Sequence, residues 1–570
     1  MFWSRRIPLS LFFALGIYLL LAVSTVKNVG IVGEVSTSWG MQNPPEVVID
    51  WESGEAVLAD GFKAGPLVAS QVRPLERIQL GSWSMPLAVN QYTGGPPDWP
   101  ARWIFSATHS PNAVTMLHVL MGGLLLLLTH RFLRFHGTDI AAAVAALALA
   151  TDWNFVFYRK VLGGTEVLLQ AALLLTLWAL WSRRWAGGKH GGDAIAAGVG
   201  LGLLAKATFA PTLVAFGVVV GLTRRDHPTT QAPTPLRKAR FLGIVALLTS
   251  PLWVTWLHHG LGVPAVPHVN SHDYLGFQFE RAWDGLFSTG QARETPATLW
   301  WYLSNPIPWF EAAYKSTVSS GFPWRTVGWI VPIAGSILAW RDTLESRTRA
   351  LLRFMSLFVP LQLLLLWVAN KDLHHLAQAA VPTAIWFGLA TDRLAATFTP
   401  PRSPRRAIYG VLLCFPWMVG GIHALQKTDE VLASSPIHTF TKTGQLKLQR
   451  LVQDANVKHL WASDYDLYGQ LEMRLPQTQV THVWGEVSRR ESSPSESLDA
   501  LLQAATGDHY LVVRKSAPMI YNLTPTAKDL EKASKRTGIR IEEVGFIDDS
   551  LGKWARLYAI HRSNHEQESQ

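Results

Sequence analysis

Charged residues and cysteine are both scarce in this sequence. Asp, Glu, Lys and Arg make up 16% of the 570 residues, whereas hydrophobic residues make up 48%. A soluble protein of this length would carry more charge, so the composition favours a membrane protein with a water-exposed part. The one cysteine, Cys414, lies in an apolar stretch. It excludes an intramolecular disulfide and leaves the redox compartment open.

Internal repeats are not visible in the sequence, and its polar C-terminal part has neither a glycine-rich phosphate loop nor metal-ligand spacing. Histidines such as His258, His259 and His375 could assemble a metal site, but their spacing is not that of known ligand sets. A divalent metal is therefore kept as a candidate cofactor, and no metal ligand is assigned. A net charge of +10 by itself is compatible with a nucleic-acid partner, but Lys and Arg cluster in short segments between apolar runs. That arrangement is typical of the cytoplasmic side of membrane proteins, so no nucleic-acid partner is expected.

Apolar stretches alternate with these basic segments and predict a mainly α-helical, polytopic membrane protein with about 11 spans. The stretches are residues 7–26, 113–128, 140–150, 166–181, 194–222 (two short spans), 241–257, 327–340, 354–368, 376–390 and 407–422. The first could be a signal peptide, but no small-residue cleavage site follows it, so a retained anchor is favoured. Counted from a cytoplasmic N-terminus, every basic cluster falls inside. Two long polar segments, 28–112 and 258–325, and the C-terminal part then fall outside.

The stretch 194–222 is preceded by Lys189 and followed by Arg224 and Arg225, so both of its ends are expected on the same side of the membrane. It is nevertheless too short for two full spans. We expect two short helices that meet at residues 206–211 within the membrane. Non-helical backbone at that depth is tolerated where it is buried in protein or lines a wet cavity. Lys206 is therefore a candidate ligand for a lipid phosphate, the alternative being that its side chain extends to the interface. The aromatic stretch 152–160 is expected to form an interfacial turn.

From residue 426 the chain becomes soluble in character, which predicts two domains, 1–425 in the membrane and 426–570 outside it. Alternating apolar and polar residues predict strands, and two amphipathic stretches, 493–505 and 526–538, predict helices. The expected strands are 457–462, 479–484, 510–513, 539–544 and 555–560. The fold class is thus a helical membrane domain with a C-terminal α/β domain on the outer face.

Carboxylates in the first long outer segment are candidates for a general base. Asp50 or Glu52 could accept the proton of an attacking hydroxyl, and the alternative is that both are simply solvated. Asp50 is preferred because Ile49 and Trp51 flank it and suggest a partly buried position. Arg159 could bind a phosphate or orient Asp50.

Glu166 follows Arg159 by seven residues and would share a helical face with it in one continuous helix. Gly163 and Gly164 are expected to interrupt that helix. An interfacial charge pair between Arg159 and Glu166 is the alternative to a role in substrate binding.

The run Gly198-Val-Gly-Leu-Gly-Leu-Leu-Ala-Lys206, together with the anchor and the long acidic outer segment, resembles the GT-C superfamily of glycosyltransferases. It is most similar to the family 39 branch, which includes protein O-mannosyltransferases and aminoarabinose transferases. Asp372-Leu-His374-His375, through Val381-Pro382, is similar to a late span of that branch.

The resemblance implies an enzyme that moves a sugar from a polyprenyl-phosphate carrier to an acceptor hydroxyl on a glycan, lipid or protein. It implies that Asp50 contacts the acceptor, with Glu52 as the alternate, and that Arg159 and Lys206 lie near the lipid phosphate. Glu166 and His374 are further candidates for substrate binding. In the family the acidic pair is adjacent and nearer the first span, where this sequence has Glu34. The base therefore stays open among Glu34, Asp50 and Glu52.

Two other functions remain open. A transporter or flippase of a lipid-linked or polar substrate would predict inverted repeats and mid-depth charges in several spans. A catalytically inactive GT-C-like scaffold is the second alternative. The arginine-rich inner segments and the absence of eukaryotic retention signals favour a bacterial inner membrane, with the N-terminus cytoplasmic and the C-terminal domain periplasmic.

Overall fold

The structure is a computed structural model of the chain. It describes residues 8–24, 47–50, 55–58, 63–64, 76–80, 83–90, 93–108, 110–161, 164–186, 191–223, 235–259, 297–300, 302–304, 324–342, 346–370, 373–400, 403–434, 442–462, 471, 474–475, 477–482, 498–499, 502–503, 509–514, 527–549 and 552–561.

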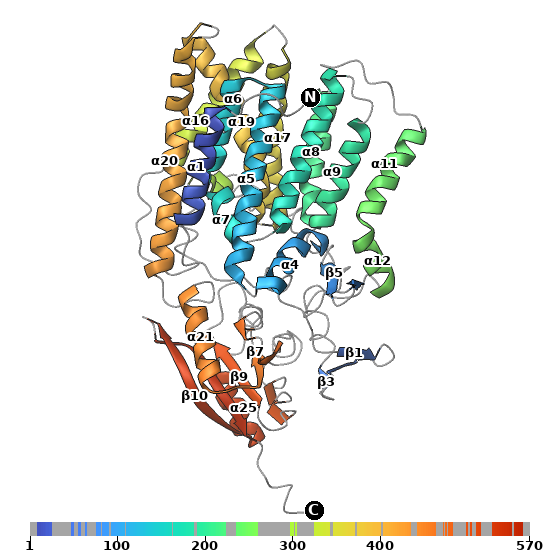
Figure 1. Cartoon of the computed structure of the whole chain (residues 1–570), viewed down its shortest axis with the longest axis vertical. Helices are drawn as coiled ribbons and strands as arrows, with labels where there is room; N and C mark the ends of the chain where they lie inside the picture. Colours follow the sequence, from blue (N-terminus) through green and yellow to red (C-terminus); the bar gives the residue numbers. More distant parts are fainter. Residues whose placement is uncertain are drawn as a thin grey trace, which may run out of the picture.

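Long helices form a bundle, and the C-terminal sheet lies at one end of it (Figure 1). We call this the sheet end, and the opposite end the basic end. The bundle helices are α1 (Leu9–Ser24), α5 (Pro111–His136), α6 (Asp139–Ala150), α7 (Trp153–Val161), α8 (Gly164–Ala186), α9 (Gly191–Ala205), α10 (Ala210–Leu222), α11 (Pro235–Leu248), α12 (Ser250–His259), α16 (Trp324–Arg341), α17 (Arg347–Asn370), α19 (Ala380–Phe398) and α20 (Pro404–Ser434).

The predicted spans fall on helices of this bundle, although 241–257 is divided between α11 and α12 and 376–390 begins before α19, so the polytopic helical fold is confirmed. Among the described residues, four helical stretches are long and apolar enough to cross a membrane: Asn112–His136, Gly164–Ser182, Arg347–Val368 and Pro404–Val431. Shorter apolar helices, such as Leu9–Ser24 and Asp139–Ala150, lie among them.

Small residues allow the central helices to pack closely. Helix α6 is nearly all Ala, Val and Leu, and most of its side chains are buried. Gly388 of α19 lies directly against the carbonyl of Ala141, where a Cβ atom would not fit. Close backbone approach of this kind stabilises helix packing in membranes, where no hydrophobic force acts between helices.

The expected interfacial turn at residues 152–160 is wrong. Asp152 caps a further helix, α7, by accepting a hydrogen bond from the Phe155 backbone N–H at 2.9 Å. Trp153, Phe155 and Val156 of this helix are fully buried in the bundle. The aromatic residues that suggested an interface therefore pack against neighbouring helices instead.

The broken pair of helices at Lys206 is confirmed. Helix α9 ends at Ala205, Lys206 is extended with φ −162° and ψ 133°, and a short 3₁₀ helix η2 (Ala207–Phe209) leads into α10. The Phe209 ring folds back onto Gly202, which has no Cβ to obstruct it.

Helix α10 runs antiparallel to α17, as two contacts between them show. Thr212 pairs with Gln362, whereas Phe216, one turn later, packs against the earlier residue Phe358 with ring centroids 5.9 Å apart. Helix α9 lies along α8 (Figure 1). The break at Lys206 is thus at the sheet end, and the helices on both sides of it run towards the basic end.

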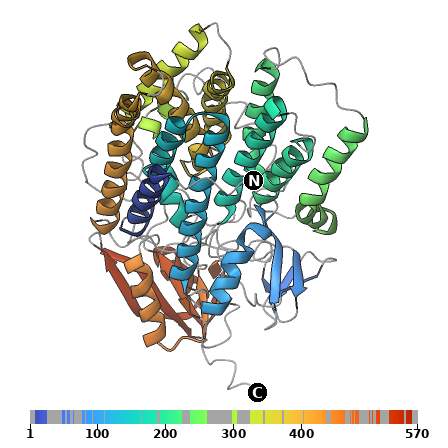
Figure 2. The same cartoon turned by 45° about the horizontal axis from the view of Figure 1, so that its top comes forward.

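The described part of the first long segment has strands, a 3₁₀ helix and an α-helix at the sheet end. Two antiparallel sheets are formed by β1 (Val47–Asp50), β2 (Glu55–Leu58) and β3 (Lys63–Ala64), and by β4 (Glu76–Leu80), β5 (Trp83–Asn90) and β6 (Thr93–Gly94). A 3₁₀ helix η1 (Pro96–Asp98) and α4 (Trp99–Thr108) follow. Figure 2 shows these strands and the C-terminal sheet at the same end of the bundle, on either side of α4.

The C-terminal part is a five-stranded sheet with helices on both faces. The strand order is β10-β11-β9-β7-β8, for β7 (His459–Ala462), β8 (Gln479–His482), β9 (His509–Arg514), β10 (Arg540–Asp549) and β11 (Gly552–His561). Alternating side chains divide between the faces: Leu460 packs with helix α21 (Lys442–Asp454), whereas Trp461 packs with α25 (Ala527–Thr537). All five predicted strands are present, as is the helix predicted at 526–538; α21 was not predicted.

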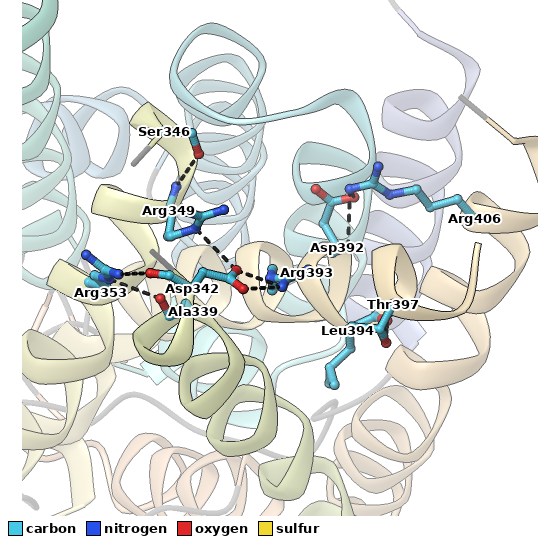
Figure 3. Close-up of polar contacts among 10 residues, drawn as sticks. All are labelled: Ala339, Asp342, Ser346, Arg349, Arg353, Asp392, Arg393, Leu394, Thr397 and Arg406. Carbon is cyan, nitrogen blue, oxygen red and sulfur yellow. Dashed lines mark hydrogen bonds and ion pairs between the residues drawn. The ribbon is translucent and has the colours of Figure 1, made fainter. Parts of the chain in front are cut away.

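Ion pairs join the helix ends at the basic end. The carboxylate of Asp342 lies 2.7 Å from Arg393 and 3.3 Å from Arg349 (Figure 3). Arg353 donates to the main-chain carbonyls of Ala339 and Asp342, at 3.0 and 2.7 Å. These contacts tie α16, α17 and α19 together beyond their apolar stretches.

Candidate functional site

Three polar contacts and one close backbone contact connect four separate parts of the chain at the sheet end. Asp98 of η1 contacts the start of α8, and Gln170 of α8 donates to the carbonyl of Ala377. Ala377 begins a 3₁₀ helix, η4 (Ala377–Ala379), whose Gln378 donates to Thr208 at the break. Finally, Gly94 of β6 lies against the carbonyl of Leu204, just before the break. We call this closed circuit of η1 and β6, the start of α8, η4 and the break the sheet-end ring.

Asp98 determines how the first long segment meets the bundle. Its carboxylate accepts from the Gly164 backbone N–H at 3.1 Å and from the Thr165 hydroxyl at 3.3 Å, and the residue is 5% exposed. A carboxylate at this position satisfies backbone donors at a helix start and interacts favourably with the helix dipole. Gly164 is required because a Cβ atom there would collide with the carbonyl of Pro97.

Glu166 and Lys206, both predicted to bind substrate, belong to this ring. Glu166 lies in the first turn of α8 and is 1% exposed, and Lys206 is 4% exposed. Burying charged groups costs free energy unless they interact with other polar groups, and both of these have such interactions. The ring therefore holds a carboxylate and an ammonium group in a largely desolvated environment, where electrostatic effects on a bound ligand are strong.

A buried ion pair lies elsewhere in the bundle, at the starts of α7 and α16. Nη2 of Arg325 is 3.1 Å from Oδ2 of Asp152, and the two side chains are 4% and 6% exposed. The Arg325 guanidinium also lies 4.9 Å from the centroid of the Trp417 ring. Because Asp152 caps α7, this pair fixes the helix that carries Arg159 to the end of the second long segment.

The other predicted residues are only partly described. Asp50 is the last residue of β1 and is opposite Glu55 in the β1–β2 register, but its side chain lies outside the described part, as do Glu34 and Glu52. Arg159 belongs to α7 and His374 to the short helix α18 (Leu373–Leu376), again without a described side chain. Their roles remain predictions.

Sequence reasoning missed Asp98 and Arg102, both buried in the described end of the first long segment. One signal was available. Gly94-Gly95-Pro96-Pro97 marks a tight turn, and an aspartate directly after it is well placed to cap a neighbouring helix. The identity of that helix is not local information, because Asp98 and Gly164 are far apart in the chain.

A metal site is not evident in the described residues, where no group of three or more His, Cys, Asp or Glu side chains could hold an ion. A divalent metal therefore remains a candidate cofactor without assigned ligands.

The described architecture is a polytopic helical fold: a bundle with a broken helix pair, the first long segment at one end of it and an α/β domain at that same end. Compared with solved structures, the chain is similar to ArnT from Cupriavidus metallidurans bound to undecaprenyl phosphate, with a TM-score of 0.53 and 12% identity. This match covers 96% of the present chain and 97% of ArnT. The GT-C fold expected from the resemblance is thereby confirmed, whereas the family 39 branch stays a prediction.

A more distant similarity is to the oligosaccharyltransferase AglB from Archaeoglobus fulgidus, in complex with an inhibitory peptide and a dolichol-phosphate. Its TM-score is 0.48 at 13% identity, over 97% of the present chain and 74% of AglB. Neither a family model nor a curated protein matches the sequence.

Proposed function

We propose that the protein is a membrane glycosyltransferase that moves a sugar from a polyprenyl-phosphate carrier to an acceptor hydroxyl at the sheet end. The observation that carries this proposal is the sheet-end ring, which buries Glu166 and Lys206 in a fold similar to that of ArnT, solved with undecaprenyl phosphate. A desolvated ammonium beside a membrane-depth break suits the phosphate of a lipid carrier.

The proposed reaction is a direct displacement with inversion. Asp50, or Glu52 in its place, takes the proton of the acceptor hydroxyl, and the acceptor oxygen attacks the anomeric carbon. The bond from that carbon to the phosphate oxygen breaks, and the electron pair leaves with the lipid phosphate. Lys206 and Arg159 stabilise the charge that builds on this phosphate. Glu166 and His374 position the substrate.

Asp98 has a different part in this proposal. Both of its carboxylate oxygens already accept hydrogen bonds from the start of α8, so it orders the ring rather than taking a proton.

The acceptor is a glycan, lipid or protein. We place the protein in a bacterial inner membrane, with a cytoplasmic basic end and a periplasmic sheet end.

The test is an assay with the purified full chain in liposomes that contain undecaprenyl-phosphate hexoses or pentoses with a labelled sugar. Release of undecaprenyl phosphate together with labelled acceptor supports the proposal. Asp50→Asn should lower turnover by roughly 100-fold or more, the usual contribution of a general base. Asp454→Asn, which changes an exposed carboxylate at the end of α21, is the matched control and should leave turnover unchanged.

The same assay distinguishes the alternatives. A flippase moves the labelled donor across the bilayer without releasing undecaprenyl phosphate, and an inactive scaffold binds it without either change. Full activity of Asp50→Asn would remove this residue as the base and leave Glu52 and Glu34 to be tested in the same way.

A further inference from the structure

Two glutamine–threonine pairs connect the broken helix to its neighbours. Nε2 of Gln378 donates to the Thr208 hydroxyl at 3.2 Å, and Nε2 of Gln362 donates to the Thr212 hydroxyl at 3.1 Å. In each pair the glutamine Oε1 is buried and has no hydrogen-bond partner among the described residues. A buried amide with one unsatisfied end costs free energy, so it needs an explanation.

The two pairs differ in their access to a ligand. Gln362 and Thr212 are both 0% exposed and are enclosed between α17 and the first turn of α10, directly after the break. Gln378 is 1% exposed, but its partner Thr208 is partly exposed and is two residues from Lys206. The Gln378–Thr208 pair therefore lies at the margin of the sheet-end ring, where a group bound beside Lys206 can reach it.

The chemistry of the pair selects a hydroxyl group. Oε1 of Gln378 can only accept a hydrogen bond, so its partner must be a donor, which an ionised phosphate oxygen is not. If the amide is turned by half a rotation, Thr208 donates to Oε1 and Nε2 needs an acceptor instead. A hydroxyl can both donate and accept, so it satisfies the pair in either orientation.

We propose that Gln378 and Thr208 form a subsite for a hydroxyl group of the sugar carried by the lipid donor. This inference rests on the proposed function and adds to it a sugar-binding position separate from the phosphate-binding cations. Lys206 holds the phosphate, whereas Thr208 of η2, in the turn directly after Lys206, and Gln378 of η4 hold a hydroxyl of the sugar. Because a site built to bind a hydroxyl discriminates strongly against a ligand that lacks it, the pair determines which sugars are accepted.

The test compares Gln378→Leu with Gln362→Leu, a matched control that removes the same amide from the enclosed pair. Each full-length variant is assayed with undecaprenyl-phosphate hexoses or pentoses that support wild-type turnover, and with their monodeoxy analogues. For Gln378→Leu we expect kcat/KM for the intact donor to fall roughly 10- to 100-fold, the effect of losing a buried hydrogen bond to a hydroxyl. Gln362→Leu should change it less than about twofold.

The deoxy analogues supply the decisive comparison. For the wild type, kcat/KM for one of the deoxy analogues should be lower than kcat/KM for the intact donor by that same factor. For Gln378→Leu the two values should be equal, because the variant has no amide left to bind the hydroxyl that the analogue lacks. Thr208→Val, at a partly exposed position, provides a second variant with the same expectation if Gln378→Leu folds poorly.

Equal kcat/KM values for the two glutamine variants would overturn the subsite. It would also be overturned if the wild type had the same kcat/KM for every deoxy analogue as for the intact donor, which is the result expected if only water binds there. No release of undecaprenyl phosphate by the wild type from any donor would overturn the proposed function and this inference with it. Normal release combined with an unaffected Gln378→Leu would overturn the inference alone.

Discussion

The buried pair of Asp152 and Arg325 allows a quantitative test of the bundle. Asp152→Asn removes the carboxylate charge but keeps a side chain that caps helices well, so the start of α7 remains satisfied. Arg325 would then be left 4% exposed, with Nε and Nη1 already lacking hydrogen-bond partners among the described residues. Leaving a buried charge without its counter-charge destabilises proteins by about 3–5 kcal/mol.

Removing both charges should cost less than removing one. In the double variant Asp152→Asn/Arg325→Met, an apolar side chain of similar length replaces the guanidinium against Trp417, and no uncompensated charge is buried. Replacements of this kind are often neutral, so we expect the free energy of unfolding to fall by less than about 2 kcal/mol. The two residues should therefore show strong coupling in a double-mutant cycle.

The free energy of unfolding can be measured by SDS titration of the full chain in mixed micelles, followed by tryptophan fluorescence. Lys427→Ala is the control, because it breaks an ion pair with Glu430 on α20 in which Glu430 is 51% exposed. An exposed pair contributes about 0–1 kcal/mol, so this variant should be near wild type. If the double variant loses as much stability as the single variants Asp152→Asn and Arg325→Met added together, the argument for a buried, mutually dependent pair is refuted.

Two further predictions concern the break and the basic end. Gly202→Ala should destabilise the protein by about 1–3 kcal/mol, because the new Cβ atom collides with the Phe209 ring. Gly217→Ala in α10 is the control and should be tolerated, because a Cβ atom there has nothing within 4 Å. Equal thermal stability of the two variants would contradict this packing. Asp342→Asn removes the carboxylate that Arg349 and Arg393 share (Figure 3). It should lower the free energy of unfolding by about 1 kcal/mol at low salt, and the difference from wild type should shrink in 1 M NaCl. A loss that does not depend on salt would show that charge is not the cause.

The prediction of the helical bundle succeeded where local composition was sufficient. A helix that must satisfy its own backbone in an apolar medium is recognisable from an apolar stretch of the right length. The break at Lys206 could be located because basic residues on both sides fixed the direction of the chain. In the C-terminal domain, strand alternation was equally local, and every predicted strand was found.

Prediction failed where burial depends on distant partners. The aromatic residues of Trp153–Val161 could suit either an interface or a core, and only the helices around α7 decide between them. Asp98 could not be recognised as the cap of α8, because its partners Gly164 and Thr165 come much later in the chain. The choice of base among Glu34, Asp50 and Glu52 remains a prediction for the same reason: it depends on which carboxylate reaches the acceptor.

The sequence by itself determined which segments form the helices of the bundle, where the α9–α10 pair is broken, and that an α/β domain follows, because hydrophobic burial and backbone hydrogen bonding act over short stretches of chain. The tertiary structure decided that the break, η1, η4 and the start of α8 meet in one ring, and that Lys206, Glu166 and Gln378 belong to it. The positions of these elements depend on close contacts, such as that between Gly94 and the carbonyl of Leu204, whose partners lie far apart in the chain. A local pattern carries no information about such contacts.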